Sequence, residues 1–306
     1  MRIKLKPWLF FAVLALCAGA IVFGIDHYRH RFVRSDADMV ALLPSGDATI
    51  FFANVAALRQ AGVLGLFGGS KTVEEPEYQD FVRQTHFDYR SDIEVIAGAM
   101  DAKQVLLIVR GRFDWGRLSQ YALAHGGTCK NRLCNLPTTK AGSWASFIPI
   151  QSDVMGLALC KNSSGALVLS PRRDRMSQQV PSAPVWVKLA RNLLDDPVSL
   201  PVPLRIFAIS LQSAARVLLS LHSGGESGAA FSLQLDAECP SRATADTIKT
   251  QLELQTRLFR IELARERRKP TQDDFAGMLT AGIFHVSDKQ VVGIWPIQKE
   301  LLNRLK

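Results

Sequence analysis

The chain has 306 residues, of which 47% are hydrophobic and 21% charged. This composition is typical of a folded globular protein and excludes a disordered or fibrous chain. The formal net charge is +9, but residues 1–34 hold six Lys or Arg and one Asp, so the rest of the chain carries only +4. No basic stripe interleaved with aromatic residues stands out, and we do not expect nucleic-acid binding.

Residues 7–25 form an uncharged and mostly apolar segment near the N-terminus. Their number is close to the ~20 residues that a helix needs to cross the hydrocarbon core of a bilayer. A helix is the only single-pass solution, because lipid cannot satisfy backbone polar groups. Trp8 and Tyr28 flank the segment, as interfacial aromatic residues do. We therefore predict a single transmembrane helix, with residues 1–34 as a membrane anchor and its flanks.

Three other interpretations of this segment stay open. It is a signal peptide cleaved after "AGA" (residues 18–20), a lipid-modified site at Cys17, or a buried core helix. The apolar run continues past both candidate sites to Ile25, which favours the uncleaved anchor. Lys and Arg number three on each side, so the positive-inside rule does not decide the orientation. Because only six residues precede the segment, we predict that the long C-terminal part lies outside the cytoplasm.

The first elements after the anchor are a tether and a short helix that ends at Pro44. A buried strand over residues 49–54 and a helix that stops at Gly62 follow. Pro76 and its acidic neighbours predict the first turn of another helix. Two apolar runs around the polar turn "DAK" then predict a β-hairpin over residues 92–114.

The string "GRFDW" (residues 111–115) joins the end of this hairpin to a predicted helix over residues 115–125. In a structural interpretation, Asp114 caps the helix, because its carboxylate can accept backbone N–H bonds, and Trp115 packs. In a functional interpretation, Arg112, Asp114 and Trp115 form a binding rim where strand meets helix. Capping alone accounts for Asp114, which favours the structural interpretation.

Four cysteines follow the anchor, and two of them, Cys129 and Cys134, enclose a four-residue polar loop. We predict that they form a disulfide closing a short hairpin in an oxidising compartment. Free thiols are the second interpretation, and a metal site with His125 is the third, since three irregularly spaced donors are weak evidence. Cys160 and Cys239 end apolar runs, and their pairing does not follow from the sequence.

The rest of the chain alternates between strand-like and helix-like patterns. The strings "WASFIPI", "VMGLALC" and "ALVLS" predict strands, and "VWVKLARNLLDD" predicts an amphipathic helix. The strand "RIFAISL" opens a second unit, and the run "SAARVLLSL" that follows it fits either a helix or a strand. The strand "GAAFSLQLDAEC", a long helix over residues 243–268, a short helix "DDFAGMLT" and a hairpin turning at residues 287–289 come next. The long helix carries an apolar stripe made of Ile248, Leu252, Leu258, Phe259 and Leu263.

These patterns predict an α+β fold, with a first unit over residues 35–175, a linker with a helix over 176–203 and a second unit over 204–306. The order of strand, Asp and helix in "LLIVRGRFDWGRLSQYALAHGG" recurs in "FSLQLDAECPSRATADTIKTQLELQ". Two diverged repeats of one α+β unit would explain this recurrence.

No pattern of catalytic or cofactor-binding residues is present. The sequence lacks a G-x-S-x-G elbow, and the adjacent acids Asp195 and Asp196 would point about 100° apart on a helix. We expect no catalytic residue, no cofactor and no metal. None of the six histidines has the spacing of a paired metal ligand: His27, His30, His86, His125, His222 and His285.

Several strings resemble a group of uncharacterised, membrane-anchored bacterial exported proteins. They are "LLPSGDATIFFANVAALR", "FDYRSDIE", "GRFDW", the pattern over residues 279–284 and "GIWPI". The resemblance implies an extracytoplasmic α+β domain of unknown function, and it brings no catalytic residues.

The sequence therefore predicts a membrane-anchored, non-enzymatic envelope protein that binds a protein, peptide or lipid partner or serves as an accessory subunit. One alternative is an extracytoplasmic hydrolase whose Asp, Glu or His residues come from distant positions. Another is a binder of anionic surfaces through the basic residues 257–269, although Glu262 and Glu266 interleave there as on a solvated helix face.

Overall fold

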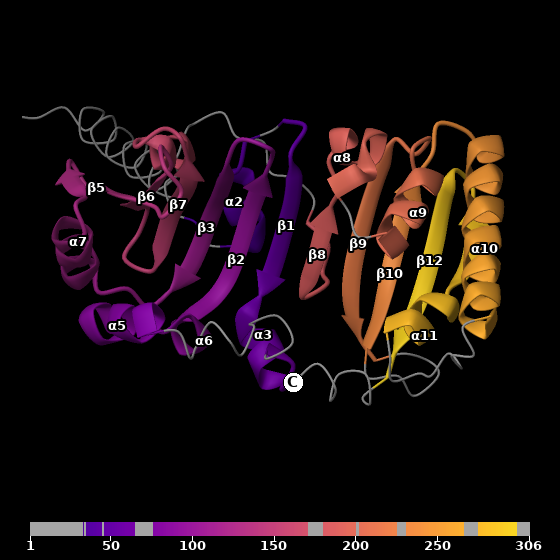
Figure 1. Ribbon diagram of the computed structural model, residues 1–306, viewed down its shortest axis with the longest axis horizontal. Helices are drawn as coiled ribbons and strands as arrows, with labels where there is room; N and C mark the ends of the chain where they lie inside the picture. The colour runs from indigo at the N-terminus through magenta and orange to yellow at the C-terminus, as the bar shows by residue number, and fades with distance from the viewer. Residues whose placement is uncertain are drawn as a thin grey trace, which may run out of the picture.

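The computed structural model describes Val33 and residues 35–44, 46–64, 76–170, 180–199, 202–224, 231–265 and 275–298. These residues form one 12-stranded sheet with helices on both faces, and every strand pair is antiparallel (Figure 1). The α+β class is therefore confirmed. The strand order is β11-β12-β10-β9-β8-β1-β2-β3-β7-β6-β5-β4.

The strands are β1 Thr49–Asn54, β2 Ile93–Met100, β3 Val105–Gly111, β4 Thr128–Lys130, β5 Leu133–Pro137, β6 Trp144–Pro149, β7 Val154–Cys160, β8 Val185–Lys188, β9 Arg216–Ser223, β10 Phe231–Glu238, β11 Ile283–Ser287 and β12 Gln290–Ile297. The helices are α2 Asp36–Ala41, α3 Val55–Gln60, α5 Pro76–Thr85, α6 Tyr89–Asp92, α7 Trp115–Ala124, α8 Arg191–Asp195, α9 Val202–Ser210, α10 Arg242–Arg265 and α11 Phe275–Thr280, with short 3₁₀ helices η2 Gly165–Leu169 and η3 Pro197–Ser199.

The strand order of the first half, β1 to β7, is repeated in the second half, β8 to β12. Three strands in sequence order come first, β1-β2-β3 and β8-β9-β10, and the last strand of each half then pairs with the third. Helices separate the first strand from the second, and the third strand from those that follow, in both halves. Among the described residues of the second half, no hairpin corresponds to β4–β5.

The two halves join where β1 pairs with β8. The backbone N–H of Asn54 donates to the carbonyl of Pro184 over 2.7 Å, and the rings of Phe52 and Trp186 stack with centroids 5.7 Å apart. The predicted helix over "VWVKLARNLLDD" is wrong in its first part, which is strand β8. Val185 and Val187 are β-branched and fit a strand, and pairing with both β1 and β9 decides the conformation.

Two predicted strands are helical. "ALVLS" lies mostly in η2, where the backbone N–H of Ala166 donates to the hydroxyl of Ser146 and Leu169 enters the core. "RIFAISL" lies mostly in α9, with Pro203 in the first turn, where a missing N–H costs nothing. A short apolar run cannot be assigned to strand or helix by periodicity alone, and packing decides.

The predicted anchor over residues 7–25 lies outside the described residues. Within the described part of the chain, no helix combines the length and the hydropathy that a membrane crossing requires.

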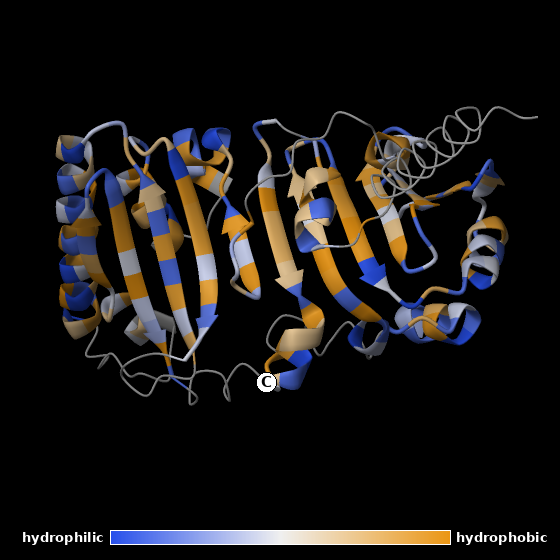
Figure 2. Ribbon diagram, turned by 180° about the vertical axis from the view of Figure 1, so that it is seen from behind, coloured by the Kyte–Doolittle hydropathy of each residue, from blue (hydrophilic) through white to orange (hydrophobic). Residues whose placement is uncertain are grey.

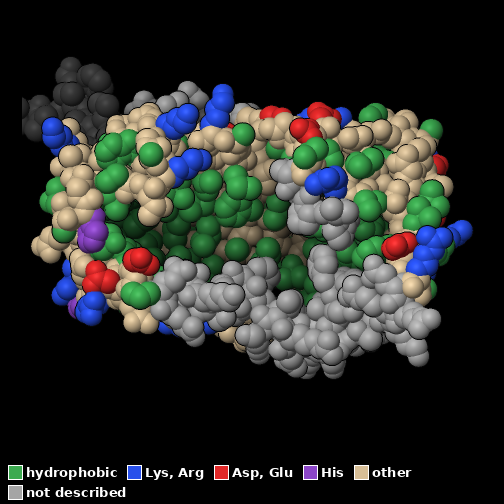
Figure 3. Space-filling view, viewed as in Figure 1, with side chains coloured by type: hydrophobic (Ala, Val, Ile, Leu, Met, Phe, Trp, Pro, Cys, Tyr) green, Lys and Arg blue, Asp and Glu red, His purple; other side chains and the backbone are tan. Residues whose placement is uncertain are grey.

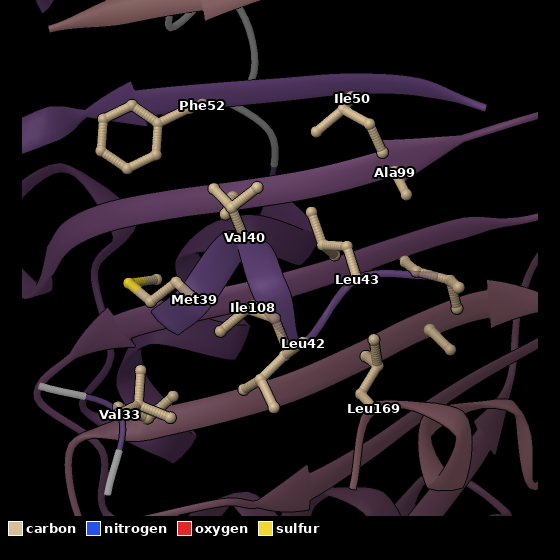
Figure 4. Packing of buried hydrophobic residues seen from close by; sticks show 14 of the residues in the cluster. Val33, Met39, Val40, Leu42, Leu43, Ile50, Phe52, Ala99, Ile108 and Leu169 are labelled. Carbon is tan, nitrogen blue, oxygen red and sulfur yellow. The ribbon is translucent and has the colours of Figure 1, made fainter. Parts of the chain in front are cut away.

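One core cluster lies on the back face of the first half, away from the viewer in Figure 1. Figure 4 shows Met39, Val40 and Leu42 of α2 and its end packed toward Ile108 and other strand residues. Ser35 begins α2 with a capping box, in which its hydroxyl accepts from the N–H of Asp38. In Figure 2, α2 lies across this face of the sheet.

A second core cluster lies on the front face of the second half, under α9, α10 and α11. Ile248 and Leu252 of α10 are fully buried against Leu235 and Val291 of the sheet. The predicted stripe on α10 is correct except at Leu258, which is 49% exposed. The uncovered back face of this half carries polar residues, and β9, β10 and β12 show alternating hydrophilic and hydrophobic bands in Figure 2.

Candidate binding surface

The strands β2, β3 and β7 carry apolar residues on both faces. Their back-face residues, such as Ala97, Ile108 and Ala158, are fully buried against α2 and η2. The strand period of two places the next residues on the front face, and these are apolar as well. We call seven of them, from β1, β2, β3 and β7, the open face: Phe51, Ile96, Met100, Val105, Leu107, Leu157 and Leu159.

The open face is only partly covered. Met100 and Leu159 are 46% and 39% exposed, and the other five residues are half-buried. An antiparallel sheet with one solvated face normally alternates apolar and polar residues, whereas apolar runs on both faces are typical of a sheet buried on both sides. The open face therefore has the composition of a buried surface but is only partly covered. Ile96, Leu107 and Leu157 pack against the cluster that includes Leu118 of α7 and Phe147 of β6, while Met100 and Leu159 stay exposed.

The second half of the molecule shows how such a face is closed. The equivalent front-face residues Val217, Leu235 and Val291 are at most 1% exposed beneath their helices. The helix after the third strand has 24 residues in the second half, α10, but only 10 in the first, α7. At 1.5 Å per residue, α7 is about 15 Å long and α10 about 36 Å. α7 packs on α5, β4 and β5, whereas residues of α8, α10 and α11 and of the segment after α9 together bury the equivalent face of the second half.

Figure 3 shows the result as a hollow in the front surface, floored by hydrophobic side chains over the strands of the first half. Phe51 lies across β2 at Gly98, where an added Cβ would collide with the Phe51 ring and with the side chain of Leu107. A glycine at position 98 therefore leaves the space in which the Phe51 ring packs across β2. Lys and Arg side chains appear along the upper margin of the hollow (Figure 3).

Helices α5 and α6 lie at the opposite end of these strands, where a polar cluster holds them in place. The hydroxyl of Tyr78 donates to the Asp88 carboxylate over 2.8 Å, and Asp88 caps α6 and pairs with the guanidinium of Arg90 at 2.9 Å. Burial disfavours ionisation of Asp88, but the hydrogen bonds from Arg90 and Tyr78 outweigh it and hold the pKa of this carboxyl below its ordinary value. Burial and the Asp88 bond raise the pKa of Tyr78.

The three residues of the predicted rim lie beside α7, and each has a structural contact. Arg112 pairs with Asp92 at 2.7 Å, and the carboxylate of Asp114 accepts the backbone N–H of Arg117 over 3.0 Å as the helix cap. The indole N–H of Trp115 donates to the carbonyl of Ser152 over 2.9 Å. The capping role predicted for Asp114 is confirmed, while a binding role for the three residues stays a prediction.

Cys129 and Cys134 form a disulfide across the β4–β5 hairpin, as predicted. The turn residues Asn131 and Arg132 both have positive φ, 49° and 69°, as a tight two-residue hairpin turn requires. The disulfide, Trp115 and Phe147 line a pocket of about 280 Å³ beside α7. Cys160 and Cys239 are buried and free, so they do not pair with each other.

One side-chain pair was missed by the sequence patterns. The hydroxyl of Ser220 and Nε2 of His222 are 2.9 Å apart on β9, which is the start of a nucleophile–base arrangement. Ser220 is only 3% exposed, and in the described part of the chain no carboxylate bonds to His222. The pair therefore lacks both substrate access and an orienting acid.

The basic stretch predicted over residues 257–269 is described up to Arg265. Both Nε and a terminal nitrogen of Arg260 donate to the carbonyl of Thr280, and Arg265 lies 3.6 Å from Glu262. These contacts are structural. Among the described residues, no group of three or more His, Cys, Asp or Glu side chains is arranged to hold a metal ion.

No protein-family model matches this chain, and no curated protein matches it. Crystal form I of TP0453 is similar in structure, with a TM-score of 0.50 at 13% identity over 89% of this chain and 98% of that one. Crystal forms III and IV of TP0453 give TM-scores of 0.49 and 0.46, at 12% and 11% identity, over 89% and 87% of this chain and 98% and 95% of theirs. The likeness to crystal form I shows a shared fold and nothing further.

Proposed function

We propose that this chain is a non-enzymatic binding protein of the cell envelope that holds a small apolar ligand on the open face. The single observation that carries the proposal is a partly covered apolar surface, with Met100 and Leu159 exposed, on strands that are apolar on both sides. Exposed apolar patches of this kind mark interaction sites, because leaving them in water costs free energy.

The chemistry of the open face favours binding over catalysis. All seven of its residues are apolar, so it offers no side chain that could act as an acid, a base or a nucleophile. Concave, mostly apolar surfaces are the usual sites of small-ligand binding. The hollow in Figure 3 has this character.

The N-terminal segment supports the location in this proposal. An uncharged run over residues 7–25 would hold the chain at a membrane, with the folded part on the outer side. A disulfide between Cys129 and Cys134 fits an oxidising compartment. The resemblance to membrane-anchored exported proteins points the same way.

The repeated strand order supports a further part of the proposal, namely that the two halves are diverged copies of one α+β unit. On this view the second copy keeps its front face closed by residues of α8, α10 and α11, and the first copy has lost part of such a cover. The binding surface is then the face exposed by this divergence.

Photocrosslinking in cells tests the proposed function on the full-length chain. A photoreactive amino acid is placed at Met100 on the open face, and in matched controls at Ile283 or Leu254, which are 67% and 48% exposed in the second half. We expect a small-molecule adduct at position 100, seen by intact mass, and none at the control positions. Capture of a protein instead, or equal labelling at all three positions, would contradict the proposal.

A further inference from the structure

Resting on the proposed function, we propose that the ligand of the open face is a single-chain amphiphile with an acidic head, such as a long-chain fatty acid. Its chain lies along β2 and β3, and its carboxylate lies at the end of the sheet where Lys103, Lys140 and Lys161 gather. The arrangement that carries the inference is an apolar surface with cations at one end of its strands.

The strand register brings the three lysines to the same end of the sheet. Val105 pairs with Leu159, and the register continued past this pair places the β2–β3 turn, with Lys103, beside Lys161. The β5–β6 turn that carries Lys140 lies at this end as well, because Trp144 pairs with Cys160. Lys161 is two residues beyond Leu159, so strand alternation directs it to the side of the open face.

The charge at this end is suited to an anion. All three lysines are exposed, and in the part of the chain that the structure describes none of them forms an ion pair. The nearby acid, Asp101, is held within its own turn, where its carboxylate accepts the N–H groups of Lys103 and Gln104 over 2.7 and 3.0 Å. This end of the sheet therefore carries three lysines and one acid, Asp101, and the Asp101 carboxylate already accepts two hydrogen bonds from its own turn.

The length of the surface fits a long acyl chain. On β2 the open face runs from Ile96 to Met100, five residues that span about 17 Å at 3.4 Å per residue. Along this length the open face contains no polar side chain, and the exposed Met100 and Leu159 lie at the lysine end. A ligand with one polar end and an apolar body matches this distribution.

Other occupants fit the same surface less well. A second copy of the chain, in a symmetric dimer, would place the same hollow surface on both sides of the interface. Two hollow surfaces are not complementary in shape, so they would not pack closely. A bilayer surface would be met by a flat or protruding apolar patch and not by a hollow (Figure 3). An amphipathic helix has polar flanks along its whole length. Here the three lysines lie at one end of the strands, and at the other end Arg90 and Arg112 are paired with Asp88 and Asp92.

The test uses the full-length chain in nanodiscs of neutral phosphatidylcholine with a photoactivatable long-chain fatty acid. After irradiation, mass spectrometry maps the adducts. We expect them on β2, β3 and β7, with competition by the unlabelled fatty acid about three- to tenfold stronger than by the alcohol of equal chain length, since exposed charge pairs contribute modestly. Shortening the competitor by two methylene groups should weaken it on the order of tenfold.

Two pairs of charge variants separate the head group from the chain. Lys103→Gln with Lys161→Gln should abolish the preference for acid over alcohol and leave the alcohol unchanged. The matched control, Lys130→Gln with Lys289→Gln, removes the same charge from the end of β4 and from the β11–β12 turn and should keep the preference. Leu159→Glu should reduce labelling by the fatty acid, while Ile283→Glu should not.

The other possible outcomes separate the acidic-ligand inference from the proposed binding function. Equal competition by the acid, the alcohol and the alkylamine, or unchanged preference in the lysine variant, refutes the acidic ligand while the proposed function stands. Absence of open-face adducts with every probe refutes both. Labelling that needs anionic lipid in the disc and no free fatty acid would show a bilayer contact and overturn the inference.

Discussion

At the scale of single residues, local polar contacts decide where helices begin. The side chains of Asn54, Asp88 and Asp114 each accept a backbone N–H at the start of α3, α6 and α7. These bonds satisfy donors that have no partner within the helix. Because each capping bond joins residues only two or three positions apart, the residue type at the cap largely predicts where the helix begins.

The cap of α7 leads to a stability prediction. Replacing Asp114 with Ala leaves the N–H of Arg117 without this acceptor and should lower the free energy of unfolding by about 1 kcal/mol. Urea unfolding followed by circular dichroism measures the change. Asp153→Ala, at an exposed position in the β6–β7 turn, is the control, and an equal loss in both variants would contradict the capping role.

The pKa of Asp88 leads to a prediction about pH. This pKa is lower in the folded chain than in the unfolded one, so the carboxylate contributes stability above its unfolded pKa of about 4, and this contribution is lost as pH falls through the folded pKa. Asp88→Asn should therefore be less stable than the parent at neutral pH, and the difference should shrink below about pH 4. Thermal melts between pH 3 and 7 test this, and a difference independent of pH would refute it.

At the scale of elements, the β4–β5 hairpin combines turn geometry with a covalent bond. Its strands have three and five residues, which is too little pairing for an independent hairpin. The disulfide holds it, and Cys134, only 3% exposed, packs with Phe147 of β6 and Leu118 of α7. The hairpin thus forms one edge of the first half.

Loss of the disulfide should be measurable. Cys129→Ser with Cys134→Ser removes the covalent bond that closes a loop of six residues. The loss should lower the free energy of unfolding by about 2 kcal/mol, because the unfolded chain is then less constrained. Guanidinium unfolding of the oxidised parent and of the variant gives the difference. A reductant should bring the parent to the stability of the variant and should leave the variant unchanged; any other response would argue against the bond.

At the scale of the whole molecule, the two halves share one sheet. β8 is a strand of four residues that lies between β1 and β9. Both of these partner strands are distant from β8 in the sequence. The hydroxyl of Thr49 also accepts the N–H of Ala190 over 3.2 Å. Each half therefore supplies an edge that the other half covers.

This arrangement predicts that the halves depend on each other. Residues 33–170 produced alone would expose the edge of β1 and the face of Phe52 that stacks on Trp186, and should aggregate. Production together with residues 180–298 should restore a soluble complex, measured by gel filtration. A monomeric, folded first half with protected β1 amides in hydrogen exchange would contradict this view.

The sequence by itself determined the features that depend on contacts between neighbours in the chain. The capping of α7 by Asp114, the β2–β3 hairpin and the Cys129–Cys134 disulfide belong to this group, since a few adjacent residues contain the whole interaction. The strand–Asp–helix order predicted as a repeat holds only in part: Asp114 caps α7, whereas Asp236 lies within β10 and Ser241 accepts the N–H of Thr244 at the start of α10.

Only the tertiary structure decided the rest. "VWVK" became a strand and "RIFAIS" a helix because packing, and for β8 pairing with β1 and β9, outweighed weak local preferences. The apolar runs of β2, β3 and β7 indicated burial on both faces, and this signal could have pointed to the open face. Whether helices cover a face depends on the position of elements far away in the chain, since residues of α8, α10 and α11 together bury the front face of the second half, and no local pattern contains that information.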